Sequence, residues 1–213
     1  SNHMPLSTDE FIGRSALVRR LVKELRAERR IISLKGPGGV GKTRIALEVA
    51  ARLGDDFIGG TWFVTLEEVS DRTAALMAIM DSLRVSSPVK EANEMEAAIA
   101  SVLSMRGACL IVMDAAESVP QEVKQLIERW SVGAPDVRWI VTTRRLIQLS
   151  EGSVEEVGPL PQRDALSLYR SRAESVLPGS ASGPSVRKLQ RMVDAVDRIP
   201  YAIELIAARA AAS

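Results

Sequence analysis

The chain of 213 residues is 46% hydrophobic and 26% charged, with 28 Lys and Arg against 27 Asp and Glu and a formal net charge of +1. A disordered or low-complexity chain and a small disulfide scaffold are therefore excluded, and one or two globular domains are expected. The even charge balance gives no electrostatic reason to expect nucleic acid or an anionic membrane as the main partner.

The cysteine and histidine content restricts the chemistry and the compartment. One cysteine, Cys109, cannot form an internal disulfide, and no apolar run approaches the roughly 18 residues of a membrane span, so we expect a cytoplasmic protein. Residues 1–4 lack the regions of a signal peptide and are interpreted as a leftover of expression. They contain the only histidine, His3, which excludes histidine-based metal or triad chemistry. Cys109 lies in an apolar run and is interpreted as a buried small hydrophobe.

The first part of the chain alternates helical and strand patterns. Residues 17–25 carry one apolar stripe opposite mostly basic residues, which predicts an amphipathic helix with a solvated charged face. An apolar run at 31–35, a glycine cluster and a helical pattern over 42–53 then predict strand, loop and helix. Further strands are predicted at 61–66, 108–113 and 137–143. Apolar strands alternating with helices indicate the α/β class, as a three-layer α/β/α sandwich with a parallel sheet.

After about Gly158 the pattern changes to helices alone. Helices are predicted over 162–176, 185–196 and 201–212, and a loop over 178–184. Three consecutive helices without a strand indicate a small C-terminal helical subdomain. The expected organisation is therefore the leftover at 1–4, an α/β domain at 5–158 and the helical subdomain at 159–213.

Residues 36–43 read Gly-Pro-Gly-Gly-Val-Gly-Lys-Thr and fit the phosphate-binding pattern G-x-x-x-x-G-K-[ST] between a strand and a helix. The glycines let successive backbone N–H groups turn toward an anion at a helix N-terminus. Lys42 would bridge the β- and γ-phosphates, and the Thr43 hydroxyl would coordinate Mg²⁺. The alternative is a plain glycine turn. The residues expected to contact the nucleotide here are Pro37, Gly38, Gly39, Val40, Gly41, Lys42, Thr43 and Arg44. The fold expected from this motif is that of a P-loop NTPase.

Two acids follow the apolar run at 109–113. Asp114 ends the run, and parallel sheets bind ligands at the edge formed by the carboxyl ends of their strands. Asp114 is therefore the predicted magnesium-side acid, acting through water; the alternative is an aspartate that caps the next turn. Glu117 is the nearby carboxylate that would polarise an attacking water, and its alternative is an exposed glutamate at a helix start.

The strand predicted at 137–143 delivers Arg144 to the same edge of the sheet. A guanidinium there would sense the γ-phosphate that distinguishes ATP from ADP. Arg145 is the competing residue for this role. The alternative for either arginine is a surface ion pair.

With these elements placed, the sequence resembles the NB-ARC branch of the STAND NTPases over nearly its whole length. Residues 11–14, Phe-Ile-Gly-Arg, look like the hhGR motif that packs on adenine, so the resemblance makes Ile12 and Arg14 adenine-site residues. Residues 198–205, Arg-Ile-Pro-Tyr-Ala-Ile-Glu-Leu, are similar to the GLPLAIEL stretch of the helical ARC1 subdomain. This resemblance implies that Pro200 contacts the base, whereas by itself Pro200 would be a helix-starting proline.

The sequence departs from the family pattern in two places. Ala115 stands where eukaryotic members have a second acid, and Glu117 is the nearest replacement, so slow hydrolysis is expected. Arg198 and Ile199 stand where Gly and Leu are usual, next to the proline of the adenine contact. The chain also ends shortly after Leu205, so we expect a fragment whose winged-helix segment lies in a longer protein.

The resemblance implies a Mg²⁺-dependent switch that binds ADP in a closed state and ATP in an open, signalling state. Its partners would be the winged-helix and sensor domains of the same protein. The rival is an AAA+ working ATPase that loads or remodels complexes on DNA, since these enzymes also have an F-x-G-R-like segment and a helical lid. A small-molecule or nucleotide kinase is a third reading, for which no second substrate-specific constellation is found. For this chain alone we expect a monomer that binds ADP, hydrolyses ATP weakly and does not bind nucleic acid directly.

Overall fold

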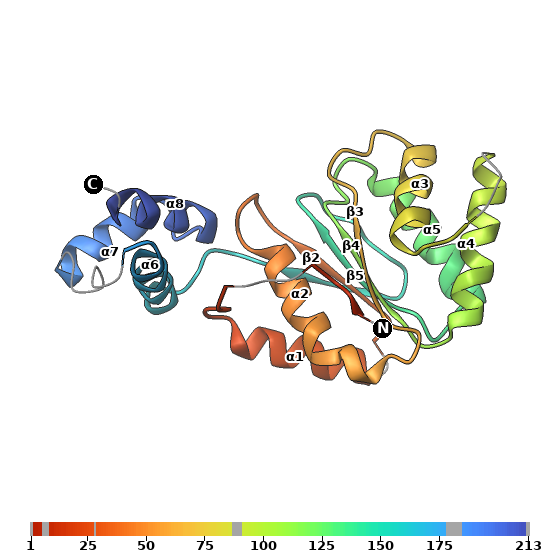
Figure 1. Cartoon of the computed structure of the whole chain (residues 1–213), viewed down its shortest axis with the longest axis horizontal. Coiled ribbons are helices and arrows are strands. Elements are labelled where there is room, and N and C mark those ends of the chain that lie inside the picture. The colour runs from red at the N-terminus through yellow and green to blue at the C-terminus, as the bar shows by residue number, and fades with distance from the viewer. Residues whose placement is uncertain (1, 6–8, 28, 87–90, 178–184, 212–213) are drawn as a thin grey trace. The chain divides into compact units, whose positions relative to one another are not determined.

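The computed structural model describes residues 2–5, 9–27, 29–86, 91–177 and 185–211 (Figure 1). The chain divides into two compact units. The first, the sheet unit, consists of residues 1–7, 18–36 and 42–156; the second, the helical unit, consists of residues 8–17, 37–41 and 157–213. Along the chain, the division therefore falls inside the phosphate-binding motif.

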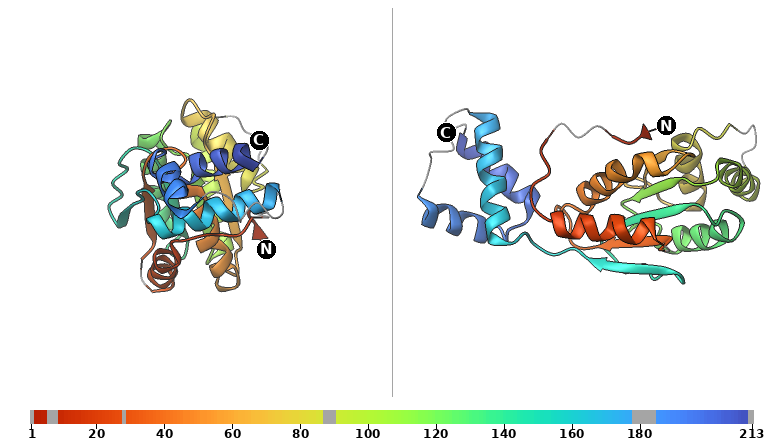
Figure 2. Two further views of the ribbon diagram at one scale, coloured as in Figure 1. Left: turned by 90° about the vertical axis from the view of Figure 1, so that its left-hand side faces the viewer. Right: turned by 90° about the horizontal axis from the view of Figure 1, so that it is seen from below.

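The sheet unit contains a parallel six-stranded sheet with helices on both faces (Figure 2). Its strands are β1 (Asn2–His3), β2 (Ile31–Lys35), β3 (Thr61–Thr65), β4 (Leu110–Asp114), β5 (Arg138–Thr143) and β6 (Gly152–Glu156). Their order across the sheet is β1-β3-β4-β5-β2-β6. The four strands predicted from apolar runs are β2 to β5, so the predicted three-layer α/β fold with a parallel sheet is confirmed.

The helices that connect β2 to β5 lie where right-handed crossovers place them. The α-helices are α1 (Ser15–Arg26), α2 (Lys42–Leu53), α3 (Arg72–Ser82), α4 (Ala92–Arg106) and α5 (Pro120–Gly133), and a 3-10 turn follows α2 at Gly54–Asp56. The chain crosses the sheet in one direction from β2 to β3 and returns in the other direction from β3 through β4 to β5. Right-handed connections in opposite directions put their helices on opposite faces. Accordingly α2 lies on one face, and α3, α4 and α5 lie on the other (Figure 1). Helix α1, which precedes β2, lies on the same face as α2.

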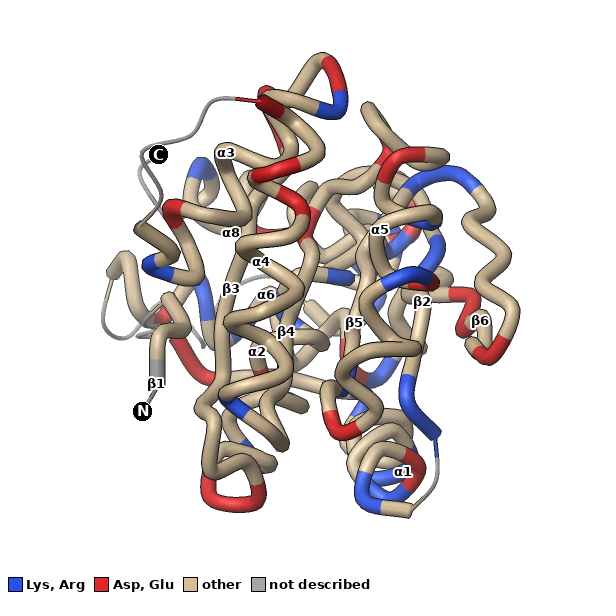
Figure 3. Tube along the Cα trace, turned by 90° about the vertical axis from the view of Figure 1, so that its right-hand side faces the viewer, with Lys and Arg blue, Asp and Glu red and all other residues tan. Residues whose placement is uncertain are grey.

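The edge strand β6 is not predicted by the sequence. Its residues are exposed or half-buried, so it has no apolar run and no core-facing stripe. It pairs with β2 in parallel, and its acids contact basic side chains of the same unit. Glu156 lies 3.3 Å from the Lys35 ammonium, and Glu155 lies 2.7 Å from the Arg20 guanidinium. Figure 3 shows this acidic segment at the edge of the sheet next to β2.

The other edge strand, β1, comes from the segment interpreted as a leftover. Asn2 and His3 pair in parallel with Thr61 and Trp62 of β3. The His3 ring stacks on the Trp62 ring with 3.9 Å between their centroids. These residues therefore extend the sheet by one short strand, whatever their origin.

The helical unit has its own core. It contains α6 (Gln162–Val176), α7 (Val186–Asp194) and α8 (Pro200–Ala211), close to the three predicted helices. The loop predicted at 178–184 lies outside the described residues. Ile12, from the N-terminal segment, packs against the core of this unit. That core is formed by Leu160, Ala165, Leu168, Tyr169, Ala173, Leu189, Val193, Ile203 and Ala207.

No helix in the described ranges is both long enough and apolar enough to span a membrane. Cys109 is completely buried just before β4, so its interpretation as a small hydrophobe is confirmed. Burial raises the pKa of the Cys109 thiol to about 11. The thiolate, which is the reactive form, is therefore scarce at neutral pH.

We predict that Cys109 does not react with a thiol-specific disulfide reagent at pH 8 while the chain is folded, because it is both inaccessible and protonated. In guanidinium chloride it should react with a stoichiometry of one. Release of the coloured leaving group measures both rates, and a variant with Ser101→Cys on the exposed side of α4 is the positive control. Rapid labelling of the native chain at Cys109 would contradict this assignment.

Candidate functional site

The strand order brings the predicted site residues of the sheet unit to one edge. The phosphate-binding motif begins at Gly36, directly after β2, and Asp114 is the last residue of β4. Strand β5 lies between these two strands and ends at Thr143. Because all three strands are parallel, their carboxyl ends meet at the same edge, where α/β sheets bind ligands.

Asp114 is held by two hydroxyl groups. The Thr43 hydroxyl donates to Asp114 Oδ1 at 2.7 Å, and the Thr142 hydroxyl donates to the same oxygen at 2.6 Å. The predicted metal residues Thr43 and Asp114 are therefore together in the structure. Neighbouring strands lie about 4.8 Å apart, so β2 and β4 are about two spacings apart, and Thr142 on β5 occupies the place between them.

Thr142 also fixes the backbone turn that follows Asp114. Its hydroxyl accepts a hydrogen bond from the Ala115 N–H at 3.0 Å, and its carbonyl accepts one from the Ala116 N–H at 2.9 Å. Ala115 has φ of +59°, a left-handed conformation that is unfavourable for a residue with a side chain. Thr142 is not among the site residues predicted from the sequence. The feature that could have identified it is its position one residue before the end of a predicted strand, at the sheet edge where Asp114 is expected.

Lys42 is nearly buried and its ammonium group donates to the Gly36 carbonyl at 2.9 Å. Lys42, near the end of the phosphate-binding motif, thus contacts the first residue of that motif. Burial lowers the pKa of the Lys42 ammonium. The negative charges of Glu117 and Asp114 raise this pKa, and the positive charge of Arg144 lowers it. These four charged groups are consequently close enough to act on one another, as a phosphate site requires.

Glu117 and Arg144 form an ion pair. The Arg144 Nε lies 2.9 Å from Glu117 Oε1, with side chains 63% and 21% exposed respectively. The surface ion pair that was the alternative for Arg144 is thus present. Glu117 is half-buried and lies three residues before the start of α5. Its Oε2 is buried and makes no hydrogen bond to the described residues. The competing Arg145 has an exposed side chain, and its backbone is held by the Thr143 hydroxyl through its N–H and its carbonyl.

The helical unit brings together the residues predicted for the adenine site. A Cβ placed on Gly41 would lie 3.7 Å from the Arg14 guanidinium and 3.9 Å from Pro200 Cγ. The Tyr201 N–H, next to Pro200, donates to the Gly39 carbonyl at 3.1 Å. Three segments that are far apart in sequence therefore meet: the N-terminal arm (residues 9–14), the loop at Gly39 and Gly41, and the start of α8.

Arg14 is anchored within the helical unit. Its guanidinium donates to the Gly158 carbonyl at 2.6 Å, and its backbone has φ of +55°. Burial lowers the pKa of Arg14, and the nearby Asp164 raises it. Gly13 has φ of +80°, and a Cβ there would lie 2.7 Å from the Asp164 carboxylate, so only glycine fits at this position.

Arg198, where the family pattern described above has glycine, still adopts a backbone conformation that suits glycine. Arg198 has φ of +54° and the preceding Asp197 has φ of +51°. The turn is held by hydrogen bonds from the Arg198 N–H to the Val193 carbonyl and from the Leu160 N–H to the Arg198 carbonyl. The left-handed turn before Pro200 is therefore formed with an arginine at position 198.

The oxygen donors fit a Mg²⁺ ion that is bound together with phosphates. Thr43 Oγ1 and Asp114 Oδ1 are already neighbours at 2.7 Å. The described residues contain no group of three or more His, Cys, Asp or Glu side chains able to hold a metal by themselves. Mg²⁺ usually takes one or two protein oxygens and completes its shell with water and substrate phosphates, which agrees with this small donor set.

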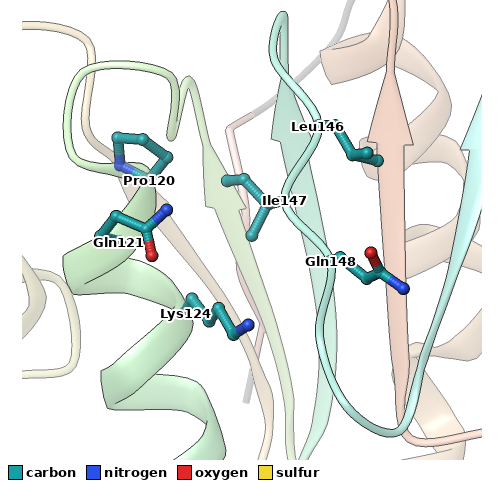
Figure 4. A pocket seen from close by; sticks show the side chains of 6 residues that line it. All are labelled: Pro120, Gln121, Lys124, Leu146, Ile147 and Gln148. Carbon is teal, nitrogen blue, oxygen red and sulfur yellow. The ribbon is translucent and has the colours of Figure 1, made fainter.

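Two cavities in the sheet unit lie outside these residues. One, of about 230 Å³, lies between the start of α5 and residues 146–148, with Lys124 and Gln148 at its wall (Figure 4). The other, of about 410 Å³, is lined by Arg30 and Ile31 at the opposite, amino end of β2. None of the residues predicted for nucleotide binding lines either cavity.

We predict that Thr142→Val lowers the free energy of unfolding by about 1–3 kcal/mol, because the Ala115 N–H loses its acceptor and Asp114 loses a donor. Urea denaturation measures this change. Thr142→Ser keeps the hydroxyl and should retain most of the stability, while Thr65→Val at the exposed end of β3 should change it by less than about 0.5 kcal/mol. Equal stability of Thr142→Val and the unaltered chain would show that these hydrogen bonds contribute nothing.

Sequence comparison finds relatives among actinobacterial proteins. An uncharacterised protein of Mycobacterium tuberculosis is 28% identical over 201 residues, which is 93% of this chain and 50% of that protein. A protein named as an HTH-type transcriptional regulator of the same organism is 26% identical over 88% of this chain and 21% of its own length. The regulatory protein AfsR of Streptomyces coelicolor is 28% identical over 98% of this chain and 22% of its own length. The chain thus spans half or less of these relatives.

Solved structures share the fold at low sequence identity. A Signal Transduction ATPase with Numerous Domains from Pyrococcus horikoshii, with a tetratricopeptide repeat sensor, matches 94% of this chain and 30% of its own with a TM-score of 0.57 and 17% identity. Cdc6p from Pyrobaculum aerophilum matches 81% of this chain and 52% of its own with a TM-score of 0.66 and 18% identity. At such identities the likeness shows the fold alone.

A family model described as AAA domain matches residues 25–141, which is more than half of the chain. The matched stretch includes the whole phosphate-binding motif, the Asp114 carboxylate and most of β5. The chain therefore belongs to the AAA domain family of P-loop NTPases.

Proposed function

We propose that this chain is an adenine-nucleotide-binding switch module of the NB-ARC branch of the STAND NTPases, with slow ATP hydrolysis. The phosphate-binding motif, the position of Asp114 and the resemblance of residues 11–14 and 198–205 to that branch support it. Two of the relatives described above are named as regulators, and the chain spans about a fifth of each. The module is accordingly proposed to be part of a longer regulator with winged-helix and sensor domains.

The ion pair between Glu117 and Arg144 is the observation that favours a switch over steady turnover. A carboxylate activates water only if an oxygen is available to take a proton from it. One oxygen of Glu117 contacts the Arg144 guanidinium at 2.9 Å, and the other is buried. The ion pair thus occupies one oxygen of this carboxylate, and Ala115 supplies no second acid. Nucleotide binding is retained, and hydrolysis is slow because Glu117 is released only when Arg144 turns to the γ-phosphate and no second acid stands beside Asp114.

The same ion pair gives ATP and ADP different effects. The γ-phosphate is an acceptor of higher charge than a carboxylate, and it binds a guanidinium through two parallel hydrogen bonds. ATP would therefore draw Arg144 away from Glu117, whereas ADP would leave the pair in place. A nucleotide shifts a conformational equilibrium only through contacts that differ between the two states. Arg144 supplies such a contact in this proposal.

The phosphate chain and the base are assigned to separate groups of residues. The backbone N–H groups of residues 38–43 and the Lys42 ammonium bind the phosphates, and Arg44 follows at the first turn of α2. Thr43 and Asp114 would hold Mg²⁺, which would supply positive charge to neutralise the phosphates. The base lies against Ile12, Arg14 and Pro200 on the helical unit.

The second candidate is an AAA+ working ATPase, favoured by the AAA domain match and by the structural likeness to Cdc6p. Working ATPases of this kind commonly complete their site with an arginine from a neighbouring subunit. Their rate per chain therefore rises with protein concentration, whereas a monomeric switch has a rate that does not depend on it.

We predict that Lys42→Ala weakens ADP binding about ten- to a hundredfold, because a charge-assisted contact worth roughly 1.5–3 kcal/mol is removed. Calorimetric titration with ADP and Mg²⁺ measures the dissociation constant. Lys23→Ala, on the exposed face of α1, is the matched control and should bind as the unaltered chain does. An ADP titration of Lys42→Ala that matches the unaltered chain would overturn the phosphate-site assignment.

For ATP hydrolysis we predict a turnover below about 1 per second, the low end of ordinary enzymes, at every protein concentration tested. Phosphate release from Mg-ATP measures it, and Lys42→Ala provides the background rate. A turnover above that limit which also increases with protein concentration would support the working ATPase instead.

A further inference from the structure

Arg172 carries a buried charge in the helical unit, on the face of α6 that is away from solvent. The residue is only 9% exposed. Its guanidinium contacts two carboxylates that are distant in sequence, Asp9 at 3.3 Å and Glu204 at 3.0 Å. A guanidinium that is removed from water is stable only when it is paired and hydrogen-bonded. Arg172 therefore ties the N-terminal arm and α8 to the same point on α6.

The arm that Arg172 holds is the segment that carries two residues of the proposed base site. Asp9 precedes Ile12 by three residues and Arg14 by five. Ile12 packs on the core of the helical unit, and Arg14 donates to the Gly158 carbonyl. The ion pair with Asp9 is the attachment at the beginning of this arm.

The second carboxylate belongs to the helix that carries the third residue of the base site. Glu204 lies four residues after Pro200, one turn further along α8. Helices α6 and α8 are already joined through apolar side chains, including Leu168 and Ile203. The arm, by contrast, adds only the partly buried Ile12 to that core, so its position depends more on polar contacts.

We propose that Arg172 is a positioning residue for adenine recognition, and this inference rests on the proposed nucleotide-binding function. It does not contact the nucleotide. Arg172 pairs with Asp9 and Glu204 at the same time. In this way it fixes the position of Ile12 and Arg14 relative to Pro200 of α8. The base is then recognised by a surface made from two ends of the chain, whereas the phosphates are recognised without Arg172.

Asp9→Asn tests this role most cleanly, because Arg172 keeps Glu204 as a partner and the helices keep their core. We expect the dissociation constant for ADP to rise about fivefold, the effect of losing one partly exposed ion pair. The dissociation constant for inorganic pyrophosphate, which has no base, should not change. Calorimetric titration of both probes in the presence of Mg²⁺ gives the ratio of the two affinities.

Two substitutions at Arg172 itself complete the test. Arg172→Met removes both ion pairs and keeps much of the side-chain length, so ADP binding should weaken more than in Asp9→Asn. Arg172→Lys keeps the charge without the planar fork, so it should restore only part of the ADP affinity. Arg170→Met, an exposed position on the same helix, is the matched control and should leave both affinities unchanged.

The outcomes separate this inference from the function on which it rests. Selective loss of ADP affinity in Asp9→Asn, with pyrophosphate binding unchanged, supports the positioning role. Unchanged ADP binding, or equal weakening of ADP and pyrophosphate, overturns it while leaving the proposed function standing. If the unaltered chain binds pyrophosphate as tightly as ADP, or binds neither, the proposed adenine site fails and the inference fails with it.

Discussion

The arrangement of the candidate site depends on one carboxylate, Asp114, held between the hydroxyl groups of Thr43 and Thr142. The sheet order makes this geometry necessary, because β5 separates the strand that leads into the phosphate-binding motif from the strand that ends in Asp114. Thr43 reaches Asp114 directly, and Thr142 on β5 donates a second hydrogen bond to the same oxygen. Thr142 also holds the left-handed turn at Ala115.

The contacts of the residues around this carboxylate are the basis of the binding role that we propose. Lys42 is nearly buried, and its ammonium contacts the Gly36 carbonyl, which holds its charge beside the first residue of the motif. The acid that would activate water, Glu117, is paired with the arginine that would detect the γ-phosphate. In the function that we propose, the partner of Arg144 differs between the two nucleotides, and such a difference is what a switch needs.

Sequence reasoning predicted the parts of the fold that are recorded in apolar periodicity. Strands β2 to β5 are buried on both faces and appear as continuous apolar runs, and α6 to α8 have clear helical spacing. It missed β6, because an edge strand stabilised by ion pairs such as Lys35 with Glu156 has no such run. The same limit applies to the site. Motif spacing selected Lys42, Thr43 and Asp114, whereas Thr142 and Arg172 act through partners that only the folded chain brings near.

The account is tested most directly by a crystal structure of this chain with Mg²⁺ and ADP. It predicts the diphosphate against the backbone N–H groups of residues 38–43, the Thr43 oxygen turned from Asp114 to the metal, and the base against Ile12, Arg14 and Pro200. ADP bound elsewhere on the chain, with the hydrogen bond between Thr43 and Asp114 intact, would contradict it.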